Sequence, residues 1–344
     1  MSLWRRLGTL SFAAALAASL PAQPTPQTTL LALSKHDRTL SIVDPATLQM
    51  VAVIPVGDDP HEVVASADGR TAYVSNYGFG AFHTLAVIDL VGPKQLPFID
   101  LGALRGPHGL AFVDGKVWFT AEAAKAIGSY DPATGKIDWI MGTGQNRTHM
   151  LYVFPGAERI LTTNVNSATV SLLDHTQAPA GAPAAPPPGR PPLPGPPGGD
   201  WNETVIPVGR GSEGFDVSPD GREVWVANAA DGTISVIDLA AKRVVATLDA
   251  QVPGANRLKF TPDGRLVFVT AGTLVVLDAA ARTVIKRLPN VRGSGGILMQ
   301  PDGARAYVAC SADNSVAVID LKTLEKVGQI PIAGPDGLAW AARP

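Results

Sequence analysis

The sequence predicts an all-β protein, a seven-bladed β-propeller of four-stranded antiparallel blades whose ring is closed by the C-terminal strand joining the N-terminal blade. Three observations support this prediction. A meander of four short apolar runs repeats along the chain, the third run of each copy ends in aspartate, and the chain begins and ends partway through a copy. With 344 residues, of which 46% are hydrophobic, the chain can bury an extensive core.

The clearest copy spans residues 213–250. Its apolar runs, FDV, EVWVAN, TISVID and RVVATL, are rich in Val, Ile, Trp and Thr, which favour strands. The turn sequences PDG at 219–221 and DG at 231–232 separate runs, because proline fixes φ and glycine supplies positive φ. This copy is therefore predicted to be one antiparallel meander, the blade of a propeller.

Seven aspartates mark the ends of the predicted third strands. They follow one another at 40 to 45 residues, except for one spacing of 64 residues. Because each precedes a turn, we assign them a structural role as acceptors of backbone hydrogen bonds. A single blade cannot bury both of its faces, so seven copies predict a ring of seven. The seven are Asp44, Asp89, Asp131, Asp174, Asp238, Asp278 and Asp320.

The two ends of the chain complement each other. The segment that starts near residue 28 matches the second to fourth strands of a copy, whereas the last residues match an innermost strand alone. We therefore expect residues 338–341 to complete the blade that begins at Leu30, which removes exposed sheet edges.

Residues 1–22 are predicted to be a signal peptide. Arg5 and Arg6 precede an alanine-rich apolar run that ends at Leu20, and cleavage is expected after Ala22. The alternative, a membrane anchor, needs about 20 apolar residues, and this run is shorter. We expect residues 23–344 to form the propeller, without a membrane span, in the periplasm or outside the cell.

The net charge and the cysteine content argue against some classes of partner and cofactor. The formal net charge of −2 gives no electrostatic footprint for nucleic acid. Cys310 is the single cysteine, so no disulfide can form within the chain, and we expect it to be a small buried apolar residue. No C-x-x-C-H motif for haem attachment is present. We expect a monomer that binds neither haem nor nucleic acid.

Residues 178–200 interrupt the fourth copy. This segment is rich in proline and glycine and has almost no charge, a composition that does not pack a core. We expect a disordered insertion that leaves the face away from the channel mouth. The alternative is a docking segment for an aromatic-lined groove, which would make the protein an interaction scaffold.

The innermost strand of each blade lines the central channel, and its first residue is expected at one channel mouth. Six of these seven residues are polar, and three are histidine, which is half of the six histidines in the chain. The seven are His61, His108, His149, Glu213, Asn256, Gly295 and Asp336.

Four of these residues, His61, His108, His149 and Glu213, form a candidate site for a divalent metal ion. Neutral imidazole and carboxylate are common metal ligands. His108 and His149 are also the candidates for a catalytic role in moving a proton. The alternative is a water-filled, hydrogen-bonded polar channel, and the residues alone leave both open.

Loops between second and third strands are expected to reach the same mouth. The loop of residues 77–82 carries aromatic side chains that could form one wall of a ligand site. Together with two ring residues, the ligand-binding candidates are His36, Asn76, His83, Glu122, Asn164, Asn256 and Asp336.

Three repeats carry a family resemblance. YVSN at 73–76, VWVAN at 224–228 and AYVAC at 306–310, each followed by a V-x-V-I-D-like run, resemble the YVTN-repeat (YncE-like) β-propellers. The resemblance covers nearly all of the mature chain and implies an exported seven-bladed fold. The motif asparagine is replaced at Ser34, Ala121, Ala271 and Cys310, so the repeats have diverged.

A second resemblance concerns the channel residues. PHEVVAS at His61 and PHGLAF at His108 are similar to repeats of virginiamycin B lyase and gluconolactonase-like propellers. That resemblance implies a divalent metal and polar channel residues that open lactone or ester rings. Carried over to this chain, a metal held by the four-residue set would polarise a carbonyl or water, and a free histidine would move the proton.

The leading hypothesis is an exported propeller that binds a small molecule or a protein partner at its polar, histidine-rich channel mouth. One alternative is a metal-dependent lactonase or lyase that uses the same residues. Another is a scaffold that recruits partners through residues 178–200. Because one fold hosts many functions, the choice depends on the site.

Overall fold

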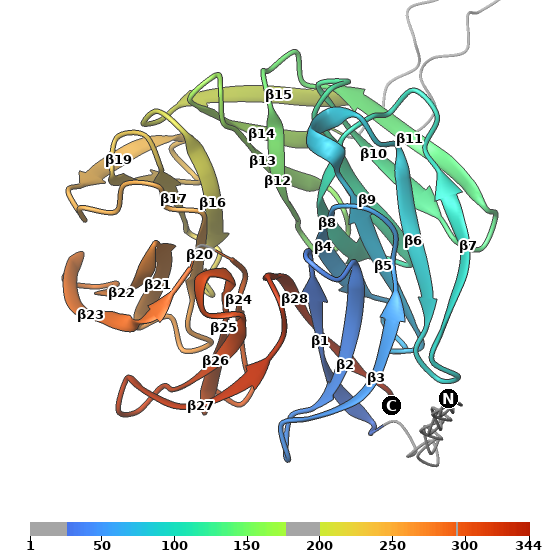
Figure 1. Cartoon of the computed structure of the whole chain (residues 1–344). Coiled ribbons are helices and arrows are strands. Elements are labelled where there is room, and N and C mark those ends of the chain that lie inside the picture. Colours follow the sequence, from blue (N-terminus) through green and yellow to red (C-terminus); the bar gives the residue numbers. More distant parts are fainter. Residues whose placement is uncertain (1–25, 177–199, 294) are drawn as a thin grey trace, which may run out of the picture.

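The protein is a closed ring of seven four-stranded antiparallel sheets, seen in a computed structural model that describes residues 26–176, 200–293 and 295–344 (Figure 1). Each sheet is one blade, and the inner strands of neighbouring blades contact one another around the channel. The helical content of the described residues is two three-residue 3₁₀ turns, η1 (Gly78–Gly80) and η2 (Ser311–Asp313). The predicted fold class is confirmed.

Six of the blades are continuous in sequence, and the seventh combines both chain ends. The blade that combines them contains β28 (Pro335–Ala342), β1 (Thr28–Ser34), β2 (Thr39–Asp44) and β3 (Gln49–Pro55). The next two blades contain β4 (Pro60–Ala65), β5 (Thr71–Asn76), β6 (Thr84–Asp89) and β7 (Lys94–Asp100), then β8 (Pro107–Val113), β9 (Lys116–Ala121), β10 (Ala126–Asp131) and β11 (Lys136–Gly142). The fourth and fifth blades contain β12 (Thr148–Val153), β13 (Arg159–Asn164), β14 (Thr169–Thr176) and β15 (Asp200–Pro207), then β16 (Ser212–Val217), β17 (Glu223–Asn228), β18 (Thr233–Asp238) and β19 (Arg243–Leu248). The last two contain β20 (Arg257–Phe260), β21 (Leu266–Ala271), β22 (Thr273–Asp278) and β23 (Thr283–Arg292), then β24 (Ile297–Met299), β25 (Arg305–Cys310), β26 (Ser315–Asp320) and β27 (Glu325–Pro331).

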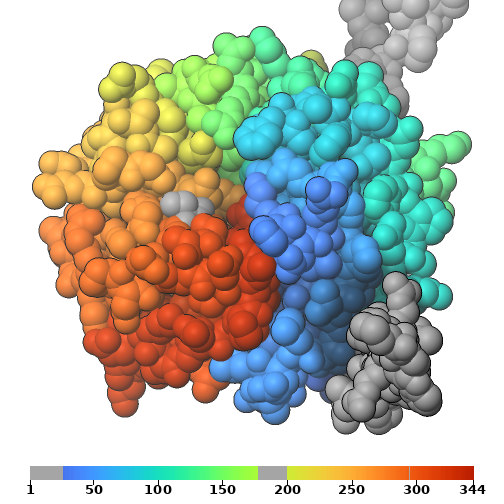
Figure 2. All heavy atoms as spheres, in the orientation of Figure 1, coloured from blue at the N-terminus to red at the C-terminus, as the bar shows by residue number. Residues whose placement is uncertain are grey.

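The ring closes where β28 pairs with β1, as predicted. Leu30 lies opposite Trp340 in an antiparallel register, and the strand is longer than the predicted residues 338–341. Figure 2 shows the blue N-terminal blade directly against the red C-terminal one. Ala339 and Ala341 are buried toward the second blade, whereas Leu338 and Trp340 are partly buried against the last blade.

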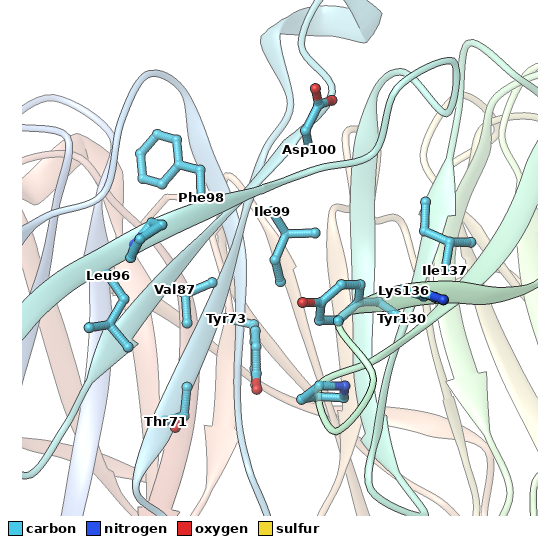
Figure 3. Close-up of a pocket in the computed structure, with 13 residues that line it drawn as sticks. Thr71, Tyr73, Val87, Leu96, Phe98, Ile99, Asp100, Tyr130, Lys136 and Ile137 are labelled. Atoms are coloured by element: carbon cyan, nitrogen blue, oxygen red, sulfur yellow. The ribbon is translucent and has the colours of Figure 1, made fainter.

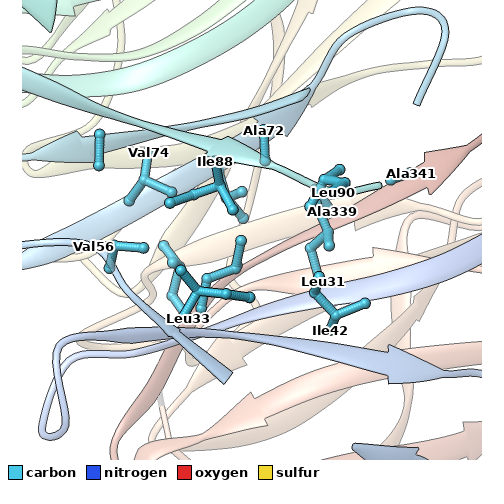
Figure 4. Packing of buried hydrophobic residues seen from close by; sticks show 14 residues of the cluster. Leu31, Leu33, Ile42, Val56, Ala72, Val74, Ile88, Leu90, Ala339 and Ala341 are labelled. Atoms are coloured by element: carbon cyan, nitrogen blue, oxygen red, sulfur yellow. The ribbon is translucent and has the colours of Figure 1, made fainter. Parts of the chain in front are cut away.

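Apolar layers between neighbouring blades form the core. In one layer, Leu31 and Ile42 of the N-terminal blade pack against Val74 and Ile88 of the next blade (Figure 4). These side chains are fully buried, and burying such a side chain contributes about 1.5–3 kcal/mol. The two middle strands of a blade are buried on both faces, while the outermost strands alternate between exposed and half-buried residues.

The aspartates at the ends of the third strands act as predicted. Asp44 Oδ1 accepts the backbone N–H of Ala46 at 2.9 Å, and five equivalents make the same kind of bond. Asp174 differs, because β14 continues past it to Thr176, and it forms ion pairs with Arg159 and Lys242 at 2.6 and 2.7 Å. These turns lie on the face opposite the channel mouth.

The predicted signal peptide, residues 1–22, and most of the predicted insertion, 178–199, lie outside the described residues. No helix in the described part of the chain has the length and apolar character needed to cross a bilayer. The strands that flank the insertion remain paired to their ends, where Thr176 lies opposite Asp200 and its hydroxyl donates to the Asp200 carbonyl at 2.9 Å.

We predict that residues 177–199 are dispensable for folding. Thr176 and Asp200 are the last pair of an antiparallel ladder, so an Asn-Gly turn can connect them directly. Since loop length has a weak effect on closure entropy, the free energy of unfolding should change by no more than about 1 kcal/mol. Urea unfolding of the shortened protein checks this, and loss of the cooperative transition would contradict it.

Candidate functional site

One end of the channel opens into a cavity of about 310 Å³. His61 on β4, His108 on β8 and His149 on β12 line this cavity together, although they come from three blades. The ring centroids of His61 and His108 are 4.8 Å apart, and those of His108 and His149 are 3.8 Å apart. The lining residues are Lys35, His61, His108, Arg147, His149, Asn256, Arg257, Gly295, Ser311, Gly334, Pro335 and Asp336.

In four blades, a β-bulge at the start of the inner strand directs a polar side chain toward the channel. In each of these blades, two successive residues of the inner strand are left out of the pairing with the second strand. The first residue of the two is His61, His108, His149 or Glu213. A bulged residue leaves the regular alternation and can be turned in a new direction. Repetition of the bulge is why residues far apart in sequence meet at one mouth.

Hydroxyl groups on the second strands tie these bulges to the next blade. Ser75 Oγ accepts a backbone N–H of its own bulge at 3.0 Å and donates to the His108 carbonyl at 2.9 Å. Thr120 repeats the arrangement: its Oγ1 accepts the Gly109 N–H at 2.9 Å and donates to the His149 carbonyl at 2.6 Å. A Cβ on Gly109 would lie 2.7 Å from the His149 carbonyl oxygen, so the close approach of the strands requires glycine.

His149 lies between two carboxylates. Its Nδ1 hydrogen-bonds to Glu122, and its Nε2 lies 2.7 Å from Glu213 Oε2. Arg147 is 3.1 Å from Glu213 and 3.5 Å from Glu122, and the Tyr77 hydroxyl donates to Glu122. Burial alone would lower the pKa of His149, but its contacts with both carboxylates raise it. Burial raises the pKa of Glu213, yet His149 and Arg147 outweigh burial and lower it to about 2.

The other two histidines of the cavity, His61 and His108, are neutral near pH 7 because their pKa values are lowered. Burial, with the charges of Lys35 and Arg257, lowers the pKa of His61 to about 2, and burial beside His149 lowers the pKa of His108 well below 6.5. Lys35 Nζ lies 2.7 Å from His61 Nε2. Nδ1 of His108 is buried and finds no hydrogen-bond partner among the residues that the structure describes.

Arg257 and Asp336 complete the cavity wall. The Arg257 side chain is buried, forms an ion pair with Glu62 and donates to Asn256 Oδ1 at 2.6 Å. Its Nε has no partner within the described segments. Asp336 lies 3.6 Å from Lys35 Nζ, and burial raises its pKa to about 6 although Arg257 opposes the shift.

The predicted ligand-binding candidates divide into three groups. Asn256 and Asp336 line the cavity, and Glu122 lies behind His149. His36 and His83 do not line this cavity, because both side chains are exposed, each with its Nδ1 2.8 Å from a nearby aspartate oxygen. Asn76 and Asn164 do not line it either, because both are buried within their blades.

The two buried asparagines have a structural role. Asn76 Nδ2 donates to the carbonyls of Val56 and Asp58 at 2.9 and 3.0 Å. Asn164 Nδ2 donates to Thr169 and Ser171 at 3.1 and 2.9 Å. Both side chains fix the end of a second strand, as Asn228 does in the fifth blade.

Three cations of the cavity were missed by sequence reasoning. Lys35 lies in a loop beside His36, Arg147 precedes His149 by two residues, and Arg257 follows Asn256. Each is thus one or two residues from a predicted candidate. A search for basic residues next to the aligned strand starts would have found them.

The geometry gives the predicted metal site no support. Across residues 26–176, 200–293 and 295–344, no group of three or more His, Cys, Asp or Glu side chains could hold a metal ion. The raised pKa of His149 favours the imidazolium, which has no lone pair for a metal. His61, His108, His149 and Glu213 therefore converge, with His149 and Glu213 forming an ion pair and His61 and His108 lying beside them as neutral imidazoles. The metal remains a prediction.

A larger hollow lies away from the channel, between the second and third blades. It has a volume of about 790 Å³ and is lined by Tyr73, Phe98, Ile99, Tyr130 and their neighbours (Figure 3). Its charged lining side chains are Asp100 and Lys136, and its described lining includes no histidine. The channel mouth is the better candidate for chemistry.

The lowered pKa values of His61 and His108 predict that the folded protein loses stability in acid. Their pKa values in the folded protein lie below the value of about 6.5 for an unfolded chain, so the unfolded state takes up more protons below that pH. These histidines should therefore not reduce the stability above pH 6.5, but should reduce it as the pH falls, by roughly 2 kcal/mol at pH 5 for His61 and by a further amount for His108. Urea midpoints measured between pH 5 and 7 check this.

The variant His61→Gln isolates one contribution to that acid sensitivity. Its free energy of unfolding should depend less on pH between 5 and 6.5 than that of the wild type. His175→Gln, beside Trp201 on the opposite face, is the matched control for loss of a histidine. An unchanged slope in His61→Gln would contradict the assignment.

Comparison with known proteins supports the fold alone. No protein-family model matches the chain, and no curated protein matches it. A functionally unknown protein from Desulfotomaculum acetoxidans matches with a TM-score of 0.70 and 15% identity, over 92% of this chain and 99% of that one. A candidate 6-phosphogluconolactonase from Bacteroides uniformis matches with a TM-score of 0.71 and 13% identity, over 92% of this chain and 100% of that one. Hydrazine synthase from Kuenenia stuttgartiensis matches with a TM-score of 0.66 and 15% identity, over 90% of this chain and 99% of that one. These similarities identify a seven-bladed β-propeller.

Proposed function

We propose that the protein binds a small molecule in the cavity at the channel mouth. One observation carries this proposal: Nδ1 of His108 is buried in the cavity wall without a partner in the described part of the chain. An unpaired buried polar group costs about 1–3 kcal/mol, which a bound atom can recover. Concave sites where several elements supply polar groups are typical of ligand binding.

Ligand-detected NMR tests the proposal with a panel of sugars, carboxylates, phosphate monoesters, amines and phenols. At least one class should bind the wild type and the far-face variant His175→Ala. Binding should be lost in Asn256→Trp, which fills the cavity. If no class binds, or if Asn256→Trp binds as the wild type does, the proposal is wrong.

A lactonase or lyase activity at the same cavity is the second candidate. It is favoured by a neutral His108 with an unpaired nitrogen, beside cationic groups that could stabilise an oxyanion. Two proteins of the same fold are candidate 6-phosphogluconolactonases. Hydrolysis of δ-gluconolactone that is lost in His108→Gln would support this candidate. Loss of activity on chelation would indicate a metal.

We further propose that the protein acts after export, from the character of residues 1–22. Fractionation of cells that express the full chain should place it outside the cytoplasm, and a chain that begins at residue 23 should stay inside. The scaffold role of residues 178–200 remains a prediction.

A further inference from the structure

We propose that the ligand of this cavity is a small oxyanion, a carboxylate or a phosphate, bound by Lys35, Arg257 and His108. This inference rests on the proposed function and names the chemical class of its ligand. It follows from which side chains face the cavity and which donors lack acceptors.

The cavity wall is rich in cations. Lys35, Arg147, Arg257 and His149 line it, whereas Asp336 is the one carboxylate among its described lining residues. Apart from Asp336, which lies 3.6 Å from Lys35 Nζ, the carboxylates that pair with the cations do not line the cavity. They are Asp59, Glu62, Glu122 and Glu213. A ligand in the cavity therefore meets the donor side of these ion pairs, together with the Asp336 carboxyl beside Lys35.

Two buried nitrogens of the wall need partners. Arg257 and His108 are only 6% and 2% exposed, and neither Arg257 Nε nor His108 Nδ1 has a partner in the described chain. A guanidinium can donate but never accept, so Arg257 Nε–H requires an acceptor atom. Lys35 adds a partly exposed ammonium, also a donor without acceptor capacity. The complement of such a wall is a group rich in acceptors and negative in charge.

The carboxylates behind the wall hold these donors in place. Glu62 fixes the Arg257 guanidinium, and Asp59, 3.2 Å from Lys35 Nζ, fixes the ammonium. Donors that are already oriented lose little conformational entropy when the ligand binds. Charge-assisted hydrogen bonds to an oxyanion are also stronger than bonds to a neutral oxygen.

Titration calorimetry at pH 7 with malonate, inorganic phosphate and malonamide tests the proposal. Malonamide has the shape of malonate without its charge, and the two anions separate a carboxylate ligand from a phosphate. At least one anion should bind at least about tenfold more tightly than malonamide. Equal or tighter binding of malonamide would overturn the anion proposal while leaving the proposed function intact. Absence of binding by all three would overturn the anion proposal, and the wider panel would then decide the proposed function.

Variants locate the binding. Lys35→Met should weaken binding of the anion at least about tenfold. Lys116→Met is the matched control, because Lys116 is similarly exposed, at 36% against 33% for Lys35, and also pairs with an aspartate, but lies at the other end of a blade. The double variant Arg257→Met/Glu62→Met removes a buried pair without leaving an unpaired charge, and it should abolish binding while the protein stays folded. Wild-type affinity in Lys35→Met, or equal loss in Lys116→Met, would overturn the proposal.

Discussion

Removal of residues 335–344 is expected to leave the protein without a stable ring. The deletion takes away β28, the inner strand of the N-terminal blade, and with it every backbone bond that β1 makes on that side. It also removes Ala339 and Ala341 from one interblade layer and Trp340 from another. Replacing a large core side chain by alanine costs about 2–5 kcal/mol, so losing the strand should exceed 5 kcal/mol. That is comparable to the total stability of a typical domain, and circular dichroism and urea unfolding measure it.

A peptide added in trans keeps this prediction testable if the truncated chain does not fold alone. A synthetic peptide of residues 333–344 should bind the truncated protein by adding a strand to the open edge, and should restore the unfolding transition. A peptide with Trp340→Ala should be less effective, because it lacks the bond from Trp340 Nε1 to the Met299 carbonyl, 2.8 Å long, and the edge-on contact with Tyr307. A truncated protein that unfolds at the wild-type urea concentration would contradict the role of ring closure.

The fold could be predicted because its signals are local and repeated. Each turn aspartate or PDG sequence acts within a few residues, and seven copies reinforce one another. The exact extent of strands is harder to predict, since it depends on partners in other blades. β28 is twice as long as expected because β1 offers partners from Thr28, opposite Ala342, to Ser34, opposite Pro335.

The candidate site could be predicted only in part. Alignment of the repeats brought His61, His108 and His149 to one mouth, because the same bulge recurs at equivalent positions. The loops between second and third strands were expected to bring His36 and His83 there as well, but both side chains are exposed and neither lines the cavity.

Ionic partners across blades were not predictable. Glu62 and Arg257 are 195 residues apart in sequence and meet only in the folded ring. A water-filled channel was one of the two alternatives that the sequence left open, whereas His108 and His149 are each only 2% exposed. A water-filled channel would tolerate loss of a histidine, but a buried ion-pair network does not.

Replacement of His149 by leucine should therefore destabilise the protein strongly. The variant leaves Glu122 and Glu213 buried with Arg147 as their remaining close cation in the described network. Removal of one partner from a buried ion pair costs about 3–5 kcal/mol, because the remaining charge is left without compensation. Urea unfolding at pH 7 measures the loss. In the same variant, the pKa of Glu213 should rise from about 2, which carboxyl NMR detects.

Two companions show whether charge is the cause. The double variant His149→Leu/Glu122→Gln removes one uncompensated carboxylate and should recover part of the lost stability. His175→Leu, in ring contact with Trp201 on the opposite face, should cost much less, since no buried carboxylate depends on it. If His149→Leu unfolds within about 0.5 kcal/mol of the wild type, the range of an ordinary surface substitution, then the carboxylates are solvated and the network does not stabilise the fold.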